Sequence, residues 1–186
     1  MRVIAGEFKG RRLKTPTWDG VRPTSDKLRE TLFNVLGARV AGARVLDGYA
    51  GTGAVGLEAL SRGASHATFV ENDRRAAALI EENARMCGLE GGYTIACADF
   101  LSSRSRVAGP FDLILLDPPY DAEHVREALE RAAHLLSPDG LVVLERATRR
   151  HPDVPSGLER VRDVRSGDST LTMFRAAAST PPPELL

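Results

Sequence analysis

The chain has 186 residues, enough for one domain of ordinary size with a sizeable core. Hydrophobic residues make up 42% of it, which excludes an intrinsically disordered chain. The formal net charge is zero, and this argues against a nucleic-acid-binding protein, because such domains are usually basic. The charges are unevenly distributed, however. Residues 1–40 hold nine basic and four acidic residues, and the remainder holds 16 basic and 21 acidic. A basic N-terminal segment on an acidic body indicates contact with a polyanion.

The remaining composition indicates a cytoplasmic protein. Cys87 and Cys97 fit neither a disulfide framework nor a Cys-x-x-Cys pair, and the four histidines are too scattered for a metal site, so we expect no metal. No apolar run of 18 residues predicts a membrane span, and the N-terminus lacks the apolar core of a secretory signal. We expect a reduced monomer, since no extended apolar surface stripe is evident.

The first predicted elements are a short hairpin of residues 2–5 and 11–14, flanking Gly6 and Gly10, and a helix. Thr24 or Ser25 can cap this helix, which runs to about Leu36. Strands and helices alternate from residue 44 onward. The predicted strands are 44–47, 67–71, 93–96, 112–117 and 141–145, and the predicted helices are 54–62, 73–87, 99–106 and 122–136.

This alternation predicts a doubly wound, mostly parallel α/β sheet. The strands are apolar runs, as expected of a parallel sheet that is buried on both faces. Residues 158–165 and 170–175 are separated by Gly167-Asp168, so they predict a closing antiparallel hairpin. Residues 176–186 contain three prolines and are expected to form a frayed tail.

A glycine-rich loop lies between the first of these strands and the helix after it. Gly51, Gly53 and Gly56 satisfy the pattern Gly-x-Gly-x-x-Gly, which allows a ligand to approach the backbone at a helix N-terminus. Glu71 follows Gly51 by 20 residues and ends the next strand, where a carboxylate can bind the hydroxyls of an adenosine ribose. The loop predicts a nucleoside cofactor, although small residues also allow tight helix–strand packing.

Asp47 separates two candidate cofactors. In the NAD fingerprint the first glycine follows the strand almost directly, whereas here Asp47 closes the strand and three residues precede Gly51. A carboxylate would be unfavourable beside a pyrophosphate but would suit the cationic amino group of a methionine moiety, which favours S-adenosylmethionine. Asp99, just after the third strand, could accept a hydrogen bond from the adenine amine or cap a helix.

The tetrapeptide Asp117-Pro118-Pro119-Tyr120 follows the fourth strand at its carboxyl end, where open α/β sheets bind ligands. Asp and Pro also form ordinary turns in this position. Two prolines make the loop stiff, so the Asp117 carboxylate and the Pro118 carbonyl can form a rigid pair of acceptors for an exocyclic amine. Tyr120 can stack on a flipped-out base. The loop therefore predicts methylation of a base amine.

These motifs together resemble a known family. Asp47–Gly56 resembles motif I of class I S-adenosylmethionine-dependent methyltransferases, and Asp117–Tyr120 resembles their amino-methylating motif IV. Five further segments resemble the RsmD family, whose members methylate N2 of one guanine in bacterial 16S ribosomal RNA. These segments are Arg2–Gly6, Gly10–Leu13, Arg22–Asp26, Arg29–Asn34 and Gly56–Arg62.

The resemblance covers about residues 2–175 and implies a Rossmann-like, seven-stranded sheet with an RNA-contacting N-terminal extension. It implies a basic extension of residues 1–40 and a methyltransferase domain of residues 41–175. It also implies S-adenosylmethionine as cofactor, and the 30S subunit or its precursor, rather than naked RNA, as substrate. The residues that would bind the cofactor are Asp47, Tyr49, Gly51, Gly53, Glu71, Asn72, Asp99 and Phe100.

The same resemblance assigns the target guanine to Asp117, Pro118 and Tyr120. Phosphate contacts are expected from six basic residues of the extension. These are Lys9, Arg11, Arg12, Lys14, Arg22 and Arg29, of which the last two could instead form ion pairs within the protein. Trp18 could stack on a base or cover the hairpin.

Three other functions compete with this one. An adenine-N6 DNA methyltransferase would share Asp-Pro-Pro-Tyr, but 186 residues leave no room for a target-recognition domain. An NAD-dependent oxidoreductase would explain the glycines but leaves Asp117–Tyr120 without a role. A catalytically dead ribosomal RNA-binding assembly factor would not need an intact Asp117 and Glu71.

Overall fold

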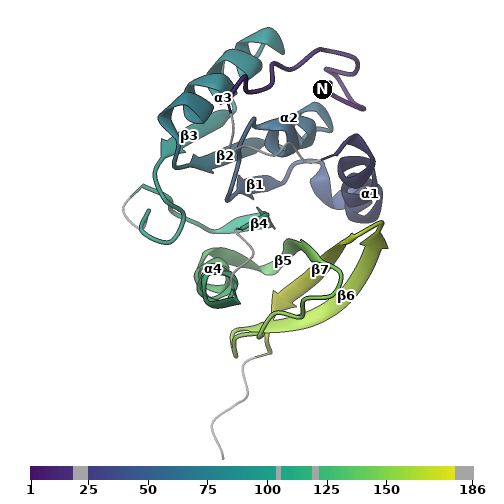
Figure 1. The fold of residues 1–186 in the computed structure, drawn as a ribbon, viewed down its shortest axis with the longest axis vertical. Helices are drawn as coiled ribbons and strands as arrows, with labels where there is room; N and C mark the ends of the chain where they lie inside the picture. Colours follow the sequence, from purple (N-terminus) through teal and green to yellow (C-terminus); the bar gives the residue numbers. More distant parts are fainter. Residues whose placement is uncertain (19–24, 104–105, 119–121, 179–186) are drawn as a thin grey trace, which may run out of the picture.

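Seven strands form a single sheet in the order β3-β2-β1-β4-β5-β7-β6 (Figure 1). The structure is a computed structural model that describes residues 1–18, 25–103, 106–118 and 122–178. The strands are β1 Arg44–Asp47, β2 His66–Glu71, β3 Tyr93–Cys97, β4 Phe111–Leu116, β5 Leu136–Ala147, β6 Leu158–Ser166 and β7 Ser169–Ala176. The helices are α1 Asp26–Leu36, α2 Ala54–Ser61, α3 Arg74–Met86 and α4 Ala122–Leu135, and a 3-10 helix covers Gly37–Val40. Strands β1 to β5 are parallel, and β7 runs antiparallel to β5 and β6.

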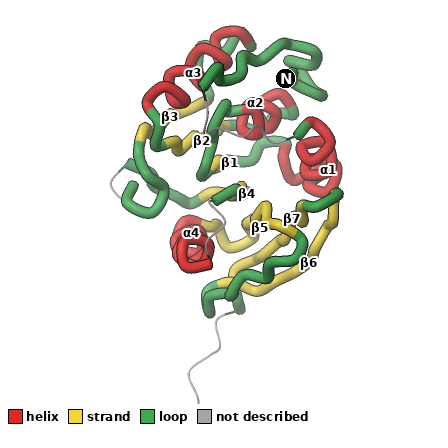
Figure 2. The backbone as a smooth tube through the Cα atoms, viewed as in Figure 1, coloured by secondary structure: helices red, strands yellow, loops and turns green. Residues whose placement is uncertain are grey.

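This topology confirms the predicted α/β fold with an antiparallel hairpin at its end. Figure 2 shows helices alternating with the strands of the sheet, as the sequence predicted. Ser25 rather than Thr24 caps α1, because its hydroxyl accepts a hydrogen bond from the N–H of Leu28 at 3.2 Å. No described helix is long and apolar enough to cross a membrane.

Alternate residues of each strand point to opposite faces of the sheet, and helices cover both faces, so side chains on both faces are buried. Val45 and Leu113 pack with α1 on one face. Leu46 and Ile114 pack with α4 on the other face. The side chains of α1 belong to the same apolar cluster as the strands, although α1 precedes the predicted start of the methyltransferase domain at residue 41.

The N-terminal segment, residues 1–14, is fastened to α2. Glu58, a fully buried carboxylate on α2, accepts hydrogen bonds from the N–H groups of Ile4 at 2.7 Å and Ala5 at 3.0 Å. The Ser61 hydroxyl, one turn later on the same helix, accepts from the N–H of Phe8 at 2.9 Å. These bonds satisfy backbone donors that a two-stranded hairpin leaves unpaired. The predicted hairpin is accordingly reduced to a single antiparallel bridge between Arg2 and Arg12.

The prediction that Arg29 contacts RNA is wrong, because its side chain is fully buried. Its guanidinium donates to the backbone carbonyl of Arg2 at 2.8 Å and to the Asp26 carboxylate at 2.6 Å. It also lies 3.8 Å from the Glu58 carboxylate. A buried charge needs partners of this kind. Arg29 therefore joins α1 to the N-terminal segment and is not accessible to an RNA phosphate.

The described part of residues 99–106 forms turns, so the predicted helix there is wrong. The Asp99 carboxylate accepts from the N–H of Ser102 at 3.1 Å, and the Ser103 hydroxyl donates to the carbonyl of Phe100 at 2.9 Å. Short polar side chains that bond to nearby backbone groups compete with helix formation in this way. Strand β5 is longer than predicted, since its pairing with β4 begins at Leu136.

We predict that Gly6→Ala destabilises the protein more than Gly10→Ala. Both glycines have left-handed backbones, with φ of +81° and +83°, so alanine costs about 1–2 kcal/mol at either position. A Cβ atom at Gly6 would lie 1.8 Å from the carbonyl oxygen of Ser61, whereas a Cβ at Gly10 meets nothing within 4 Å. Only Gly6→Ala should therefore detach the N-terminal segment from α2. Urea unfolding measures the two stabilities, and equal losses would contradict the prediction.

Candidate active site

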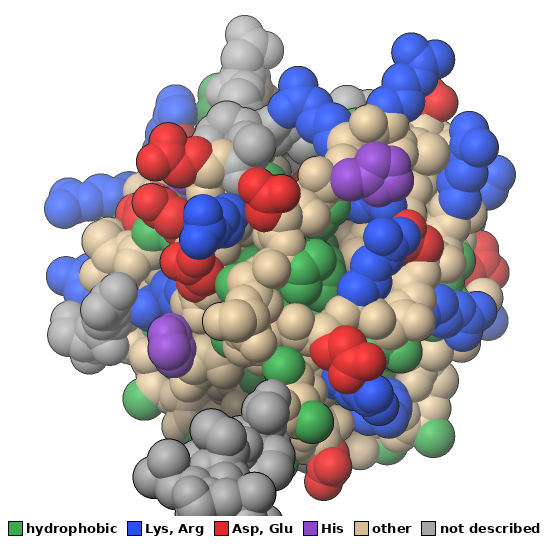
Figure 3. All heavy atoms as spheres, turned by 90° about the horizontal axis from the view of Figure 1, so that it is seen from below, with side chains coloured by type: hydrophobic (Ala, Val, Ile, Leu, Met, Phe, Trp, Pro, Cys, Tyr) green, Lys and Arg blue, Asp and Glu red, His purple; other side chains and the backbone are tan. Residues whose placement is uncertain are grey.

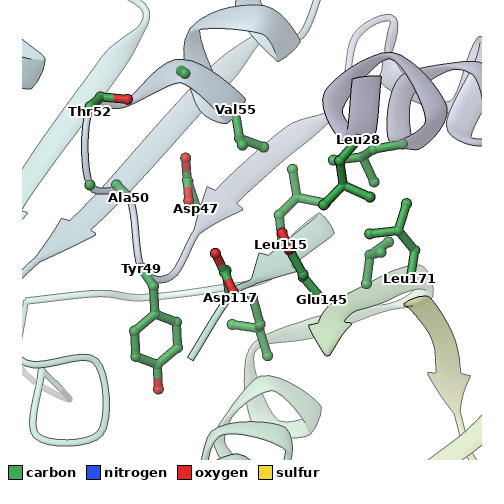
Figure 4. A pocket seen from close by; sticks show the side chains of 15 residues that line it. Leu28, Asp47, Tyr49, Ala50, Thr52, Val55, Leu115, Asp117, Glu145 and Leu171 are labelled. Carbon is green, nitrogen blue, oxygen red and sulfur yellow. The ribbon is translucent and has the colours of Figure 1, made fainter. Parts of the chain in front are cut away.

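A pocket opens at the carboxyl ends of β1, β4 and β5 (Figure 4). The glycine loop of residues 48–53 forms one wall, and side chains from α1 and β7 form the apolar wall opposite. The lining residues include Asp47, Asp117 and Glu145 on the polar side and Leu28 and Leu171 on the apolar side. This is the edge at which parallel α/β sheets bind ligands. The two loops that the sequence singled out therefore meet in one pocket.

Glu71, the residue predicted to bind the ribose, holds the glycine loop. One carboxylate oxygen of Glu71 accepts from the N–H of Gly51 at 2.8 Å, and the other accepts from the N–H of Asp73 at 2.8 Å. Gly51 and Gly53 have φ angles of +54° and +76°, a conformation that side chains other than glycine rarely adopt. The predicted spacing of Gly51 and Glu71 thus brings the carboxylate to the loop. Each oxygen keeps a lone pair for a further donor.

Asp47 lies at the centre of the site, with only 5% of its surface exposed. Its carboxylate accepts from the N–H of Gly56, in the first turn of α2, at 3.0 Å. Burial raises the pKa of Asp47 to about 7, against the hydrogen bond from Gly56, which lowers it. The charges of Glu71 and Asp117 also raise the pKa of Asp47. This carboxyl group is therefore half protonated near neutral pH, and a cation beside it would favour its ionised form.

Asp117 and Pro118 are the described part of the Asp-Pro-Pro-Tyr loop, and Tyr120 lies outside the described residues. Asp117 is half-buried directly after β4, and Pro118 is buried. In Figure 4 the side chains of Asp47 and Asp117 project into the same pocket from neighbouring strands. Glu145, at the end of β5, is a third carboxylate of this pocket that sequence reasoning missed. The only signal for Glu145 was its place at the end of a predicted strand.

Of the other residues predicted to bind the cofactor, some are buried and some are exposed. Phe100 is buried, and its ring centroid lies 5.4 Å from that of Tyr49. Asp99 caps the turn described above, while Asn72 is exposed at the end of β2. Phe100 supports the loop from the α4 side of the sheet, where its ring belongs to the apolar cluster.

Tyr49 connects the glycine loop to α4 by a contact that the sequence did not reveal. Its hydroxyl lies 2.8 Å from Nε2 of His124, and the two ring centroids are 5.7 Å apart. His124 stands in the first turn of α4, the helix that follows the Asp-Pro-Pro-Tyr loop. No motif spacing relates these two residues, so only the folded chain brings them together.

The remaining basic residues of the N-terminal segment are exposed. Lys14 forms an ion pair with Glu82, and the Arg11 guanidinium donates to the carbonyl of Met86 at 3.0 Å, near the end of α3. Lys9 and Arg12 form no ion pair among the described residues, so, like Arg2, they are available to a ligand. Arg22 lies outside the described residues. Trp18 packs against a side chain of the protein, since the guanidinium carbon of Arg75 lies 4.9 Å from the centroid of its ring.

The chain is similar to several known proteins over most of its length. The family model described as "Conserved hypothetical protein 95" matches residues 1–175. Ribosomal RNA small subunit methyltransferase D of Escherichia coli strain K12 is 36% identical over 162 residues, which cover 87% of this chain and 79% of that protein.

Solved structures agree with the sequence comparison. The yhhF protein of Escherichia coli superposes with a TM-score of 0.85 at 28% identity, covering 96% of this chain and 99% of that one. A hypothetical protein of Thermus thermophilus superposes with a TM-score of 0.75 at 33% identity, covering 95% of this chain and 99% of that one. The chain therefore belongs to the RsmD family, as its motifs predicted.

Proposed function

We propose that this protein methylates the exocyclic N2 amine of a single guanine in 16S ribosomal RNA, within the 30S subunit or its precursor. The observation that carries the proposal is the meeting of Asp47 and Asp117 in one pocket at the carboxyl edge of the sheet. We assign one carboxylate to a cationic cofactor and the other to a base amine. The name of the Escherichia coli relative supports ribosomal RNA of the small subunit as the substrate.

The pocket fits S-adenosylmethionine as the methyl donor. Glu71 would accept hydrogen bonds from the ribose hydroxyls, next to the N–H of Gly51 that it already holds. Asp47 would bind the cationic amino group, and the same carboxylate would be unfavourable beside the pyrophosphate of a dinucleotide. When bound, S-adenosylmethionine supplies a methyl group activated by the positive charge on sulfur. This fit favours a methyltransferase over an NAD-dependent oxidoreductase.

Asp117 and the carbonyl of Pro118 would hold the target amine. An amine attached to a purine is a poor nucleophile, because its lone pair is delocalised into the ring. Two acceptors that bind its hydrogens would draw the nitrogen toward a tetrahedral geometry and direct its lone pair at the methyl group. Most of the acceleration would come from this positioning, and the acceptors would stabilise the positive charge that develops on the amine. As the new N–C bond forms, the bond between the methyl group and sulfur would break and leave a neutral thioether, and the nitrogen would lose one proton to Asp117 or to water.

The name of the Escherichia coli relative favours ribosomal RNA over DNA as the substrate, and the surroundings of the pocket offer contacts to its phosphates. The N-terminal segment adds exposed cations next to α2 and α3, and no separate target-recognition domain is present among the described residues. Phosphate contacts of such a segment position the nucleic acid without reading its sequence. We propose that the shape of the ribonucleoprotein surface supplies the remaining specificity.

We predict that Asp117→Ala abolishes methyl transfer while largely sparing cofactor affinity, because the residue acts on the amine. Asp117→Asn keeps one acceptor oxygen beside the Pro118 carbonyl but cannot take the proton, so it should retain activity if water takes the proton and lose it if Asp117 does. Transfer of labelled methyl to 30S subunits from a strain that lacks the enzyme measures activity, and calorimetry measures cofactor binding. Mapping of the labelled nucleotide tests the guanine assignment. Substantial activity in Asp117→Ala would refute the acceptor-pair mechanism, and methylation of duplex DNA but not of 30S particles would refute the substrate.

We predict that Asp47→Asn stabilises the cofactor-free protein above pH 7 and weakens cofactor binding. The pKa of Asp47 is raised from 3.8 to about 7 by folding, so the folded state binds more protons than the unfolded state in this window. The associated stability is present at low pH and is lost as the pH rises toward 7. The asparagine variant keeps an acceptor for Gly56 and does not ionise. Thermal unfolding at pH 5 and pH 8 should show that its advantage grows with pH, and an advantage independent of pH would contradict the assignment.

We predict that Lys9→Ala combined with Arg12→Ala weakens 30S binding more than Arg11→Ala combined with Lys14→Ala. Both double variants remove two charges, but Arg11 and Lys14 already contact protein groups. Each phosphate contact that is lost should reduce the slope of log affinity against log salt by about 0.7–0.9. Filter binding at several KCl concentrations measures this slope. If Lys9→Ala with Arg12→Ala leaves the slope of the wild-type protein unchanged, the segment does not bind phosphate.

A further inference from the structure

A buried arginine organises the turn that follows β5. The side chain of Arg146 is only 5% exposed. Its Nε donates to the Thr172 hydroxyl at 2.7 Å, and its Nη2 donates to the Asp163 carboxylate at 2.7 Å. Its Nη1 lies within hydrogen-bond distance of three backbone carbonyls of the turn, those of Ala147 at 3.3 Å, Thr148 at 3.2 Å and Arg150 at 2.6 Å. One guanidinium thus fixes the turn of residues 147–150 against β6 and β7.

The turn is also tied to the tip of the β6–β7 hairpin. The N–H of Thr148 donates to the carbonyl of Asp168 at 2.9 Å, and the Thr148 and Thr170 hydroxyls are 3.0 Å apart. Glu145, which lines the pocket, lies only three residues before Thr148. The turn and the hairpin tip therefore form a fixed ledge at the same edge of the sheet as Asp47 and Asp117.

Among the exposed arginines of this ledge are Arg149 and Arg165, which we call the ledge arginines. The Nε of Arg165 donates to the carbonyl of Gly167 at 3.2 Å, and Arg149 forms no ion pair among the described residues. Residues 146–168 contain six arginines and four acidic residues, although the chain after residue 40 is acidic as a whole. Of those four acidic residues, Asp163 is already paired with both Arg146 and Arg160.

The ledge and the N-terminal segment lie on opposite sides of the pocket. The N-terminal segment packs on α2, above the β1–β3 half of the sheet, whereas β6 is the edge strand at the other end (Figure 1). Figure 3 views the molecule from below, and lysine and arginine side chains gather along the right side of that face, with acidic side chains among them. A polyanion that reaches across the pocket would therefore meet cations on both sides.

We propose that the ledge arginines bind backbone phosphates of the RNA strand whose target base enters the pocket. This inference rests on the proposed function, and it adds a second phosphate-binding surface on the body of the protein. Arginine suits the task because its planar guanidinium binds a phosphate through two parallel hydrogen bonds. The fixed backbone matters because an ordered ledge loses little conformational entropy when RNA binds.

The test compares Arg149→Ala combined with Arg165→Ala with a control of equal charge change. The control is Arg39→Ala combined with Arg44→Ala, since both residues are exposed at the opposite, amino edge of the sheet. Methyl transfer to 30S subunits is measured at several KCl concentrations, and cofactor affinity is measured by calorimetry. The ledge variant should lose about tenfold in kcat/KM at moderate salt, and the slope of log kcat/KM against log salt should fall by about 1.4–1.8. Cofactor affinity should stay unchanged, and the control should behave like the wild-type protein.

The outcomes separate the two proposals. If the wild-type protein transfers methyl groups to 30S subunits and the ledge variant keeps the wild-type salt slope, the ledge inference is overturned and the proposed function stands. An equal loss in the control also overturns it, because the effect then depends on net charge alone. If the wild-type protein itself transfers no methyl to 30S subunits, the proposed function fails. In that case retention of ribosomal RNA on filters tests the ledge directly, and equal retention of wild type and variant overturns the inference.

Discussion

The carboxylate of Glu58 has no exposed surface, so its charge must be compensated inside the protein, and the way this happens determines the N-terminal half of the molecule. It accepts from two N–H groups of the N-terminal segment and from Arg62 at 2.7 Å, and Arg29 of α1 lies beside it. Helix α2, which carries Glu58, is also the helix whose first turn donates to Asp47. The cofactor loop and the basic segment are therefore mounted on the two ends of one short helix. Any displacement of that helix would move both together, which couples the position of the N-terminal segment to the cofactor pocket.

The pocket concentrates acidic groups at the place proposed for a cationic ligand. Burial is the main reason that ionisation of Asp47 is disfavoured, and the charges of Glu71 and Asp117 add to it, so the pKa of this carboxyl group is raised to about 7. A cationic ligand would replace the proton of Asp47 as the compensating charge. Carboxyl groups with perturbed pKa values are common at functional sites, and the unfavourable charge interactions there lower the stability of the folded protein. The raised pKa of Asp47 is thus what a site of this kind would show before a charged cofactor binds.

The elements that could be predicted from the sequence are those whose signals are local. The strand 44–47 has the predicted ends, and the order of strands follows from the alternation with helices. Glycine spacing likewise placed Glu71 against Gly51. The errors concern long-range burial. For Arg29 the sequence left an RNA contact and an internal ion pair open, and nothing in its neighbourhood reveals that Glu58 and Arg2 will enclose it. Tyr49 and His124 are 75 residues apart, and Arg146 lies 17 residues from Asp163 and 26 from Thr172. The helix predicted at 99–106 is a local error instead, because in the described part of this segment the side chains of Asp99 and Ser103 bond to nearby backbone groups.

The zero net charge of the chain acquires a different meaning once the charges are placed. Carboxylates line the pocket, which is the proposed site for the reactive groups of the cofactor and the base. Exposed cations lie on either side of the pocket, on the N-terminal segment and on the ledge. A strand of RNA has its negative charge on the backbone and its amines on the bases. An acidic pocket between two basic surfaces repels the backbone from the centre while it accepts a base turned inward. The same arrangement would bind an arbitrary RNA weakly, because only a strand that curves across both surfaces can reach them together. Selectivity for a shaped ribonucleoprotein would then arise from the spacing of charges rather than from their number.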